Sequence, residues 1–167
     1  MLSQPHSWSK FVKRITVNAD PQTIYNAWCT QAAIESWFLR KSIFSTEGSE
    51  KKPDEPVQTG DAYEWRWYGY EDEVTEHSKI VSANGKDMLQ FTFAGECLVT
   101  VRSYTEDGES IAELTQENIP KDDNPATNLY VGCGEGWTFY LANLKSVLEG
   151  GLDLRNKNIN IKKVVNS

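Results

Sequence analysis

The spacing of apolar residues changes twice along the chain, and each change predicts a different kind of element. The first apolar-rich run, Phe11 to Val17, is short and predicts a strand. Asp20 followed by Pro21 is typical of a helix start, and Thr30 can cap a second helix. Apolar positions keep helical spacing after these caps at Ile24, Tyr25, Ala27, Trp28, Ile34, Trp37 and Phe38. We therefore expect one strand followed by two short helices.

The middle of the chain, from Asp61 to Asn118, has the period-two alternation that is typical of strands. Asn84-Gly85 and Asp107-Gly108 are strong hairpin signals, because tight primed turns need residues that tolerate positive φ. The segment from Thr46 to Thr59 is rich in charged residues and proline, which indicates an exposed loop. The alternation predicts an antiparallel meander of about five strands after this loop.

Helical spacing returns after Pro120. Asn124-Pro125 can start a long helix and Gly150-Gly151 can end it. Its apolar stripe consists of Leu129, Cys133, Trp137, Tyr140, Leu141, Leu144 and Leu148. Gly132, Gly134 and Gly136 fall within the helix, where we expect them to allow close packing or a kink. This order of elements predicts an α+β helix-grip fold, in which a curved antiparallel sheet wraps around the C-terminal helix and leaves a concave face.

Length and composition fit one folded domain. The chain has 167 residues, of which 39% are hydrophobic, a content that supports a core without disulfides or metals. We expect a flexible N-terminus over residues 1–9, a single helix-grip domain over 10–155 and a C-terminal tail over 156–167. The three cysteines, Cys29, Cys97 and Cys133, are widely spaced in apolar contexts, which indicates reduced core thiols.

Charge and hydropathy exclude several classes of partner. The net charge of -7 repels phosphate backbones, so we expect no nucleic-acid partner. The N-terminal sequence lacks the apolar core of a signal peptide, and no run of 18 uncharged apolar residues occurs. We therefore expect a cytoplasmic protein without a membrane span.

Few residues suggest catalysis. The two histidines, His6 and His77, have no metal-ligand spacing to a cysteine, and no glycine-rich phosphate loop or nucleophile elbow occurs. We therefore expect no metal, no cofactor and no catalytic residue, and interpret the chain as a non-enzyme. His77, Arg66 and Glu96 are interpreted as surface groups, with Arg66 and Glu96 as the alternative rim of a pocket.

Aromatic residues are the most informative feature. Two strands each point alternate residues to one face: Tyr63, Trp65 and Trp67 on one, and Leu89, Phe91 and Phe93 on the other. Trp137, Tyr140 and Cys133 lie on the helix stripe above them, Trp28 and Trp37 lie near the short helices, and Gln116 is a polar group on an inward strand face. Each aromatic residue taken singly is interpreted as core. Taken as a set, they predict a ligand pocket that opens between the short helices and the long helix.

Several spaced motifs resemble the family related to the Hsp90 ATPase activator. They are Val17-Asn18-Ala19-Asp20-Pro21, Ile24-Tyr25-Asn26-Ala27-Trp28, Ile34-Glu35-Ser36-Trp37-Phe38, Trp65-Arg66-Trp67-Tyr68-Gly69, Gly136-Trp137, and Leu152-Asp153-Leu154-Arg155. The resemblance covers about residues 10 to 155. It implies membership of the START/Bet v 1-like superfamily, whose members share a cavity between the sheet and the long helix.

Three functions follow as hypotheses. The first is a binding protein that encloses a small hydrophobic molecule, which requires a continuous cavity of roughly 300 Å3 or more. The second is a chaperone-type or homodimeric interaction protein, in which the aromatic residues are core and the loop from Thr46 to Thr59 is a contact. The third is a cyclase-like or hydratase-like enzyme, which requires an acid or histidine inside the pocket.

Overall fold

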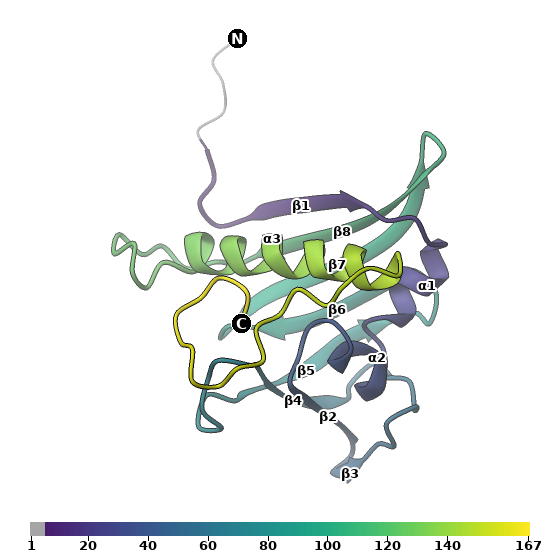
Figure 1. The fold of residues 1–167 in the computed structure, drawn as a ribbon, viewed down its shortest axis with the longest axis horizontal. Coiled ribbons are helices and arrows are strands. Elements are labelled where there is room, and N and C mark those ends of the chain that lie inside the picture. The colour runs from purple at the N-terminus through teal and green to yellow at the C-terminus, as the bar shows by residue number, and fades with distance from the viewer. Residues whose placement is uncertain (1–5) are drawn as a thin grey trace.

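The computed structural model describes residues 6–167 (Figure 1). Its elements are, in chain order, β1 (Phe11–Thr16), α1 (Pro21–Asn26), α2 (Gln31–Glu35), β2 (Lys41–Thr46), β3 (Ser49–Glu50), β4 (Ala62–Arg66), β5 (Glu76–Ala83), β6 (Met88–Phe93), β7 (Cys97–Glu106), β8 (Glu109–Glu117) and α3 (Leu129–Leu148). Residues 1–5 of the expected flexible N-terminus lie outside the described residues.

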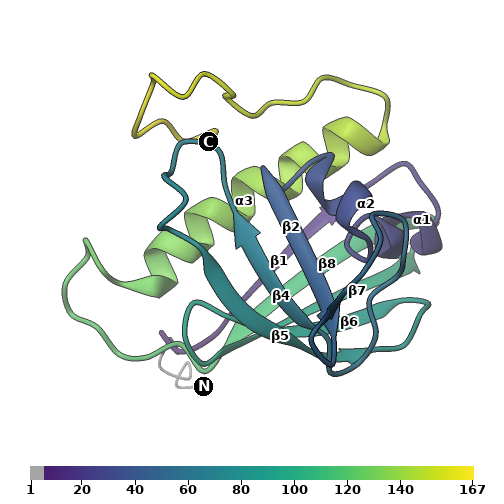
Figure 2. The same cartoon turned by 90° about the horizontal axis from the view of Figure 1, so that it is seen from below.

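All strands belong to one antiparallel sheet in the order β1-β8-β7-β6-β5-β4-β2-β3. Figures 1 and 2 show the sheet curving around α3, with α1 and α2 at one end of the curve. The α+β helix-grip prediction is therefore confirmed. The meander of five strands corresponds to β4 through β8.

The short helices begin at the predicted caps. The Asp20 carboxylate accepts a hydrogen bond from Thr23 N at 2.9 Å, and Pro21 occupies the first turn of α1. The Thr30 hydroxyl accepts one from Ala33 N at 3.1 Å at the start of α2. These bonds satisfy backbone donors that a helix start leaves free, which is why these two segments turn helical directly after β1.

Strand β2 is missing from the sequence prediction. Its inward positions are Ser42 and Phe44, while Ile43 faces outward, so the alternation of apolar and polar residues is concealed. Two residues of the predicted loop from Thr46 to Thr59 form β3, which pairs with β2 through a turn at Glu47-Gly48, where both residues have positive φ.

The two predicted hairpin turns differ in kind. Asp107 and Gly108 both have positive φ, as a primed two-residue turn requires. At Asn84-Gly85 only Gly85 has positive φ, and the Asn84 carboxamide oxygen instead accepts bonds from three following backbone N–H groups, those of Lys86, Asp87 and Met88. The hairpin is present, but its turn is a longer loop held by the asparagine side chain.

Helix α3 begins later than its predicted start at Asn124-Pro125. The Asn124 carboxamide accepts from Ala126 N, so this residue holds a turn in the preceding loop. The actual cap is Asn128, whose side chain accepts from Tyr130 N at 2.8 Å and Val131 N at 3.2 Å. The helix ends as predicted, with Gly150 at positive φ just beyond its C-cap.

The core fills the space between α1, α2, the middle of the sheet and α3. The largest fully buried side chains are aromatic: Trp28, Trp37, Trp65, Tyr63, Phe38, Phe44 and Phe91. Trp28 and Trp37 meet edge to face at 4.6 Å between centroids, and Tyr63 stacks on Trp65 at 3.8 Å. The deep part of the curved sheet is therefore solid.

Candidate functional site

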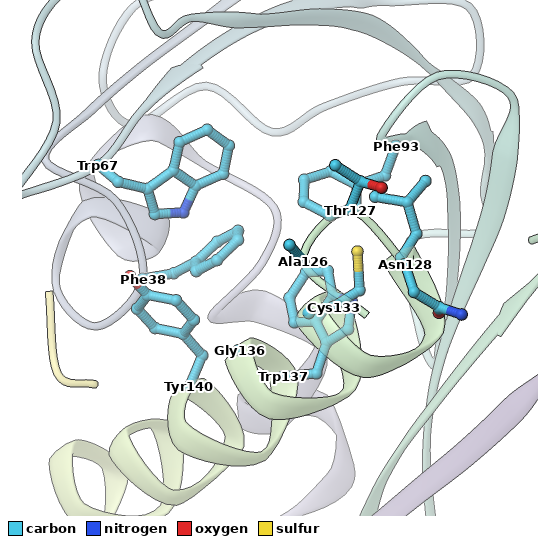
Figure 3. A pocket seen from close by; sticks show the side chains of 12 residues that line it. Phe38, Trp67, Phe93, Ala126, Thr127, Asn128, Cys133, Gly136, Trp137 and Tyr140 are labelled. Carbon is cyan, nitrogen blue, oxygen red and sulfur yellow. The ribbon is translucent and has the colours of Figure 1, made fainter. Parts of the chain in front are cut away.

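A cavity of about 440 Å3 lies between the N-terminal half of α3, the loop before it and the ends of two strands (Figure 3). We call it the inner pocket. Its lining residues are Phe38, Trp67, Phe93, Ala126, Thr127, Asn128, Leu129, Gly132, Cys133, Gly136, Trp137 and Tyr140. No lining residue carries a charge, so the cavity suits an apolar molecule.

Aromatic rings from four parts of the chain form most of the pocket wall. Trp67 directly follows β4, and Phe93 is the last residue of β6, with their centroids 6.1 Å apart. Phe93 lies 5.2 Å from Trp137 on α3, while Phe38, beyond α2, lies 4.8 Å from Tyr140. These rings present a curved apolar surface that flat or compact hydrophobic molecules can contact.

Two glycines keep the helix side of the pocket open. A Cβ atom placed on Gly132 or Gly136 would meet no heavy atom within 4 Å, because both residues face the cavity. The expectation that glycines here allow close packing is therefore wrong for these two positions. Gly134 differs, since its Cβ position lies 3.8 Å from the Lys13 side chain, away from the pocket.

Most polar side chains that border the inner pocket bond within the protein. The Thr127 hydroxyl donates to Asp122 at 2.6 Å, and the Asn128 amide caps α3 and donates to Asp122 O. The Trp137 indole N–H donates to the Gln116 Oε1 atom at 2.8 Å, and the Tyr140 hydroxyl donates to Ser167 O at 2.7 Å. These groups consequently present mainly their apolar surfaces to the cavity.

The two ionisable groups on the wall are neutral near pH 7. Burial raises the pKa of the Cys133 thiol above its ordinary value, although Gln116 opposes this shift. Burial also raises the pKa of the Tyr140 phenol. The lining includes no carboxylic acid and no histidine, so it offers none of the acid–base groups that the cyclase-like hypothesis requires.

A second cavity, of about 620 Å3, continues outward from the inner pocket. The two share the residues Trp67, Phe93, Leu129, Gly132, Gly136 and Tyr140. We call the second cavity the outer chamber. Its other lining residues are Tyr70, Val74, Glu76, Glu135, Lys163, Val164, Val165 and Ser167. The outer chamber therefore has both apolar and charged groups, in contrast to the inner pocket.

The final segment of the described chain borders this chamber. Residues 156–167, which we call the strap, contain no helix or strand and run back along α3 (Figure 2). Asn166 donates to Leu154 O at 2.9 Å, and Lys162 pairs with Glu71 at 3.4 Å. Together with the bond from Tyr140 to Ser167, these contacts hold the strap beside the pocket.

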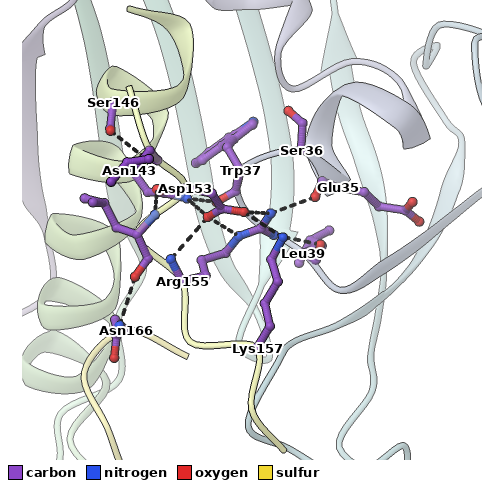
Figure 4. Close-up of polar contacts among 12 residues, drawn as sticks. Glu35, Ser36, Trp37, Leu39, Asn143, Ser146, Asp153, Arg155, Lys157 and Asn166 are labelled. Atoms are coloured by element: carbon purple, nitrogen blue, oxygen red, sulfur yellow. Dashed lines mark hydrogen bonds and ion pairs between the residues drawn. The ribbon is translucent and has the colours of Figure 1, made fainter. Parts of the chain in front are cut away.

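A buried polar cluster anchors the chain just before the strap (Figure 4). The Arg155 guanidinium donates to Leu39 O and Glu35 O and forms a two-point ion pair with Asp153. The Asn143 amide donates to Trp37 O at 2.6 Å and to Asp153 at 3.1 Å. We call Asn143, Asp153 and Arg155 the exit clamp, because they fix the exit from α3 to the loop after α2.

The structure separates the predicted site residues into two groups. Those that line the inner pocket are Trp67, Phe93, Cys133, Trp137 and Tyr140. Those that do not line it are Trp28, Trp37, Tyr63, Trp65, Phe91 and Gln116, all of which are buried. For the aromatic members of the second group, burial agrees with the interpretation as core that each received singly. Trp28, Trp37 and Trp65 therefore help to fill the core rather than border a cavity.

Gln116 lies beneath the pocket as a polar group within the core. Its Oε1 atom binds Trp137, and its Nε2 atom has no hydrogen-bond partner among residues 6–167. Of the three residues interpreted as surface groups, Glu96 is exposed and His77 is an exposed neighbour of Glu64 at 3.7 Å, whereas Arg66 is half-buried and donates to the Thr75 hydroxyl.

The predicted opening between the short helices and α3 is wrong. Trp28 and Trp37 fill that space, and no residue of α1 or α2 lines either cavity described above. The pocket instead lies toward the N-terminal half of α3. This shift follows from where side chains fill the space: Trp28 and Trp37 occupy one end of the grip, whereas Gly132 and Gly136 leave space at the other.

Sequence reasoning did not assign Phe38, the loop from 126 to 129, the helix glycines, Glu76 or Glu135 to the site. A usable signal was present for the glycines. Gly132, Gly136 and Tyr140 recur every four residues and so lie on one face of α3. Two missing side chains on the face that looks toward the sheet predict a gap there.

Two further features are absent from residues 6–167. No group of three or more histidine, cysteine or acidic side chains is placed to hold a metal ion. Within the same residues, no helix has the length and apolar character needed to cross a membrane.

A curved antiparallel sheet around a long helix, with an apolar cavity between them, defines a helix-grip protein with a hydrophobic pocket. The family model described as "Activator of Hsp90 ATPase homolog 1-like protein" matches residues 18–149. The chain therefore belongs to that family. No sequence among curated proteins matches the chain.

Solved structures resemble this fold at low sequence identity. The protein SSP2350 from Staphylococcus saprophyticus has a TM-score of 0.66 and 18% identity, covering 87% of this chain and 96% of its own. The Aha1 dimer from Colwellia psychrerythraea has a TM-score of 0.65 and 19% identity, with coverages of 85% and 97%. Ara h 8.0201 has a TM-score of 0.60 and 13% identity, with coverages of 85% and 98%. These likenesses concern the fold.

Proposed function

We propose that the protein binds a small apolar or aromatic molecule in the inner pocket without transforming it. The observation that carries this proposal is the uncharged, aromatic-walled cavity of about 440 Å3, a size within the usual range of ligand pockets. The proposed contacts are the lining side chains Phe38, Trp67, Phe93, Cys133, Trp137 and Tyr140.

Burial of apolar surface supplies the affinity in this proposal. A ligand that removes roughly 250 Å2 of apolar surface from water gains about 6 kcal/mol at the usual coefficient. Part of that gain is offset by the loss of translational and rotational freedom on binding. We therefore expect modest affinity for simple hydrocarbons and higher affinity for ligands whose shape follows the aromatic wall.

Substitution of a pocket glycine tests the proposal. Gly136→Leu places a side chain in the open space of the inner pocket, while leucine also favours the helix more than glycine does. We expect the affinity for naphthalene, followed by quenching of tryptophan fluorescence, to fall at least about tenfold, which corresponds to about 1.4 kcal/mol.

Gly134→Ala is the matched control for this test, because it changes a glycine of the same helix whose Cβ position lies outside the pocket. It should leave naphthalene binding unchanged. If wild type, Gly136→Leu and Gly134→Ala bind naphthalene equally, or if none binds it, the inner pocket is not a binding site. If Gly136→Leu alone loses naphthalene binding, native mass spectrometry of protein purified from its own host can identify a retained natural ligand.

A second candidate is an interaction protein that forms a homodimer or contacts an Hsp90-type chaperone. It is favoured by family membership, by the dimeric Aha1 neighbour, and by two exposed apolar side chains that line one surface cleft, Trp8 and Val131, which are 59% and 45% exposed. Sedimentation equilibrium should then give a dimer for wild type and a weaker one for Trp8→Ser.

A strictly monomeric wild type over the micromolar range contradicts the homodimer. The chaperone contact has its own readout: the ATPase rate of the host's Hsp90-type protein, with and without this chain, should differ.

We also propose that the protein is cytoplasmic, which the free thiols of Cys29, Cys97 and Cys133 support. Fractionation of host cells checks this location.

A further inference from the structure

The charged residues around the pocket suggest a narrower class of ligand. The inner pocket has no charged lining residue, whereas the outer chamber has three: Glu76, Glu135 and Lys163. A ligand that fills the inner pocket and extends outward therefore reaches these charges. This inference rests on the proposed binding function and concerns the chemical class of its ligand.

The aromatic wall itself favours a positively charged group. Trp67, Phe93 and Tyr140 line both cavities, so their rings stand at the boundary between the apolar interior and the charged chamber. The faces of aromatic rings carry negative potential and attract organic cations, more strongly where water is excluded. An ammonium group at this boundary would lie beside these aromatic rings.

The two carboxylates of the chamber have no basic partner. Glu76 is the first residue of β5, opposite Trp65, and its Oε1 atom accepts from Ala94 N at 2.8 Å. Glu135 precedes Gly136 on α3. Among residues 6–167, neither glutamate forms an ion pair with a lysine, arginine or histidine. Both negative charges are consequently available to a ligand.

The opposing charge is a single lysine. Lys163 belongs to the strap, so the two glutamates leave the chamber with a net negative lining. The net charge of -7 on the whole chain acts in the same direction, because it attracts cations to the protein and repels anions. A fatty acid or another carboxylate would therefore meet repulsion at the only charged part of the site.

We propose that the preferred ligands are amphipathic organic cations, with an apolar or aromatic body in the inner pocket and an ammonium group at the outer chamber. The aromatic boundary contacts the ammonium group, and Glu76 and Glu135 stabilise its charge. Binding involves no bond formation and no proton transfer.

Three probes of matched shape test the charge preference. They are phenethyltrimethylammonium, its uncharged carbon isostere neohexylbenzene, and the carboxylate hydrocinnamate. We expect calorimetry and tryptophan fluorescence to show that the cation binds about tenfold more tightly than the neutral isostere. Hydrocinnamate should bind most weakly. The preference should shrink as salt is added, since ions screen the exposed carboxylates.

The double variant Glu76→Gln, Glu135→Gln should reduce the cation preference severalfold while retaining the affinity for neohexylbenzene. Glu109→Gln, an exposed change at the start of β8, is the matched control and should change nothing. Circular dichroism and thermal melting verify that each variant is folded.

Each of the other binding results contradicts the proposed cation preference. Equal binding of all three probes, or tightest binding of hydrocinnamate, overturns the cation preference but leaves the apolar pocket in place. A cation preference that is undiminished in the double variant also overturns the proposal. Failure of every probe to bind wild type removes both this inference and the proposed binding function.

Discussion

Arg155 carries the positive charge of the exit clamp, and its side chain is only 2% exposed. It donates to the carbonyl oxygens of Glu35, at the end of α2, and Leu39, in the following loop, as well as to Asp153, so its removal leaves several buried acceptors without donors. We expect Arg155→Ala to lower the free energy of unfolding by about 3 kcal/mol, measured by urea denaturation.

Lys157→Ala serves as the control for Arg155→Ala, because Lys157 pairs with the same Asp153 carboxylate but is 52% exposed. An exposed pair of this kind contributes less than about 1 kcal/mol. If the two variants lose equal stability, the carbonyl bonds of Arg155 contribute nothing and the account of the exit clamp is wrong.

Asp153 gives the clamp a pH dependence. Burial would raise the pKa of its carboxyl, but hydrogen bonds from Arg155, Lys157 and Asn143 outweigh burial and hold the pKa well below its usual range. Because the folded state has the lower pKa, this stabilisation is complete above the unfolded pKa of about 4 and declines as the pH falls further.

Asp153→Asn should therefore flatten the loss of stability below about pH 4, although it lowers stability near neutrality. Urea midpoints recorded across the acidic range for wild type and variant check this difference. Parallel curves for the two proteins would show that other carboxylates govern the acid sensitivity.

At the scale of a whole element, Asn128 determines where α3 starts. Its side-chain oxygen accepts from two backbone N–H groups of the first turn, and its side-chain NH2 donates to Asp122 O in the loop before α3. We expect Asn128→Ala to cost about 1 kcal/mol of stability in thermal or urea unfolding.

Asn128→Asp separates the two roles of this residue. Aspartate keeps the acceptor that caps the helix but lacks the amide donor to Asp122 O. We expect this variant to retain most of the stability. A loss as large as that of Asn128→Ala would assign the effect to the loop bond rather than to the cap.

Local signals were sufficient for elements whose boundaries rest on one side chain. Asp20 and Thr30 started α1 and α2 as expected, because their caps are made within three residues. Local sequence signals were insufficient where tertiary packing determines whether an element forms. Strand β2 exists because it pairs with β4, and the inward position of Ser42 carries no apolar signal.

In the candidate site, too, local sequence signals account for some features and tertiary packing for the others. The alternation of aromatic residues correctly placed Trp65 and Phe91 on the inner face of the sheet, where both are buried. It could not tell which of these rings border empty space, because a cavity depends on how side chains from distant segments fill the volume between them. Trp67 and Phe93 reach the pocket because they lie at strand ends.

The strap relates the C-terminal part of the described chain to access to the pocket. The exit clamp ends at Arg155, and beyond the exposed pair of Lys157 with Asp153 the strap is held by few contacts, namely those of Lys162, Asn166 and Ser167. Removal of residues 158–167 should therefore leave the unfolding midpoint nearly unchanged while naphthalene associates several-fold faster, as stopped-flow fluorescence can show.

Tyr140→Phe is a milder form of this experiment, since it removes only the bond to Ser167 O. We expect an intermediate association rate for this variant. If neither change accelerates association, the strap does not limit access to the outer chamber, and ligands reach the inner pocket by another path.

Gly132 and Gly136 have no side chains, and the space that side chains would occupy at these positions belongs to the inner pocket. A change at either position would alter the shape of the cavity while the caps, the apolar stripe and the sheet stay as they are. Selection for a new ligand and selection for a stable fold would then act on different residues. Homologues can therefore diverge in what they hold through two positions of one helix, without first passing through a destabilised intermediate.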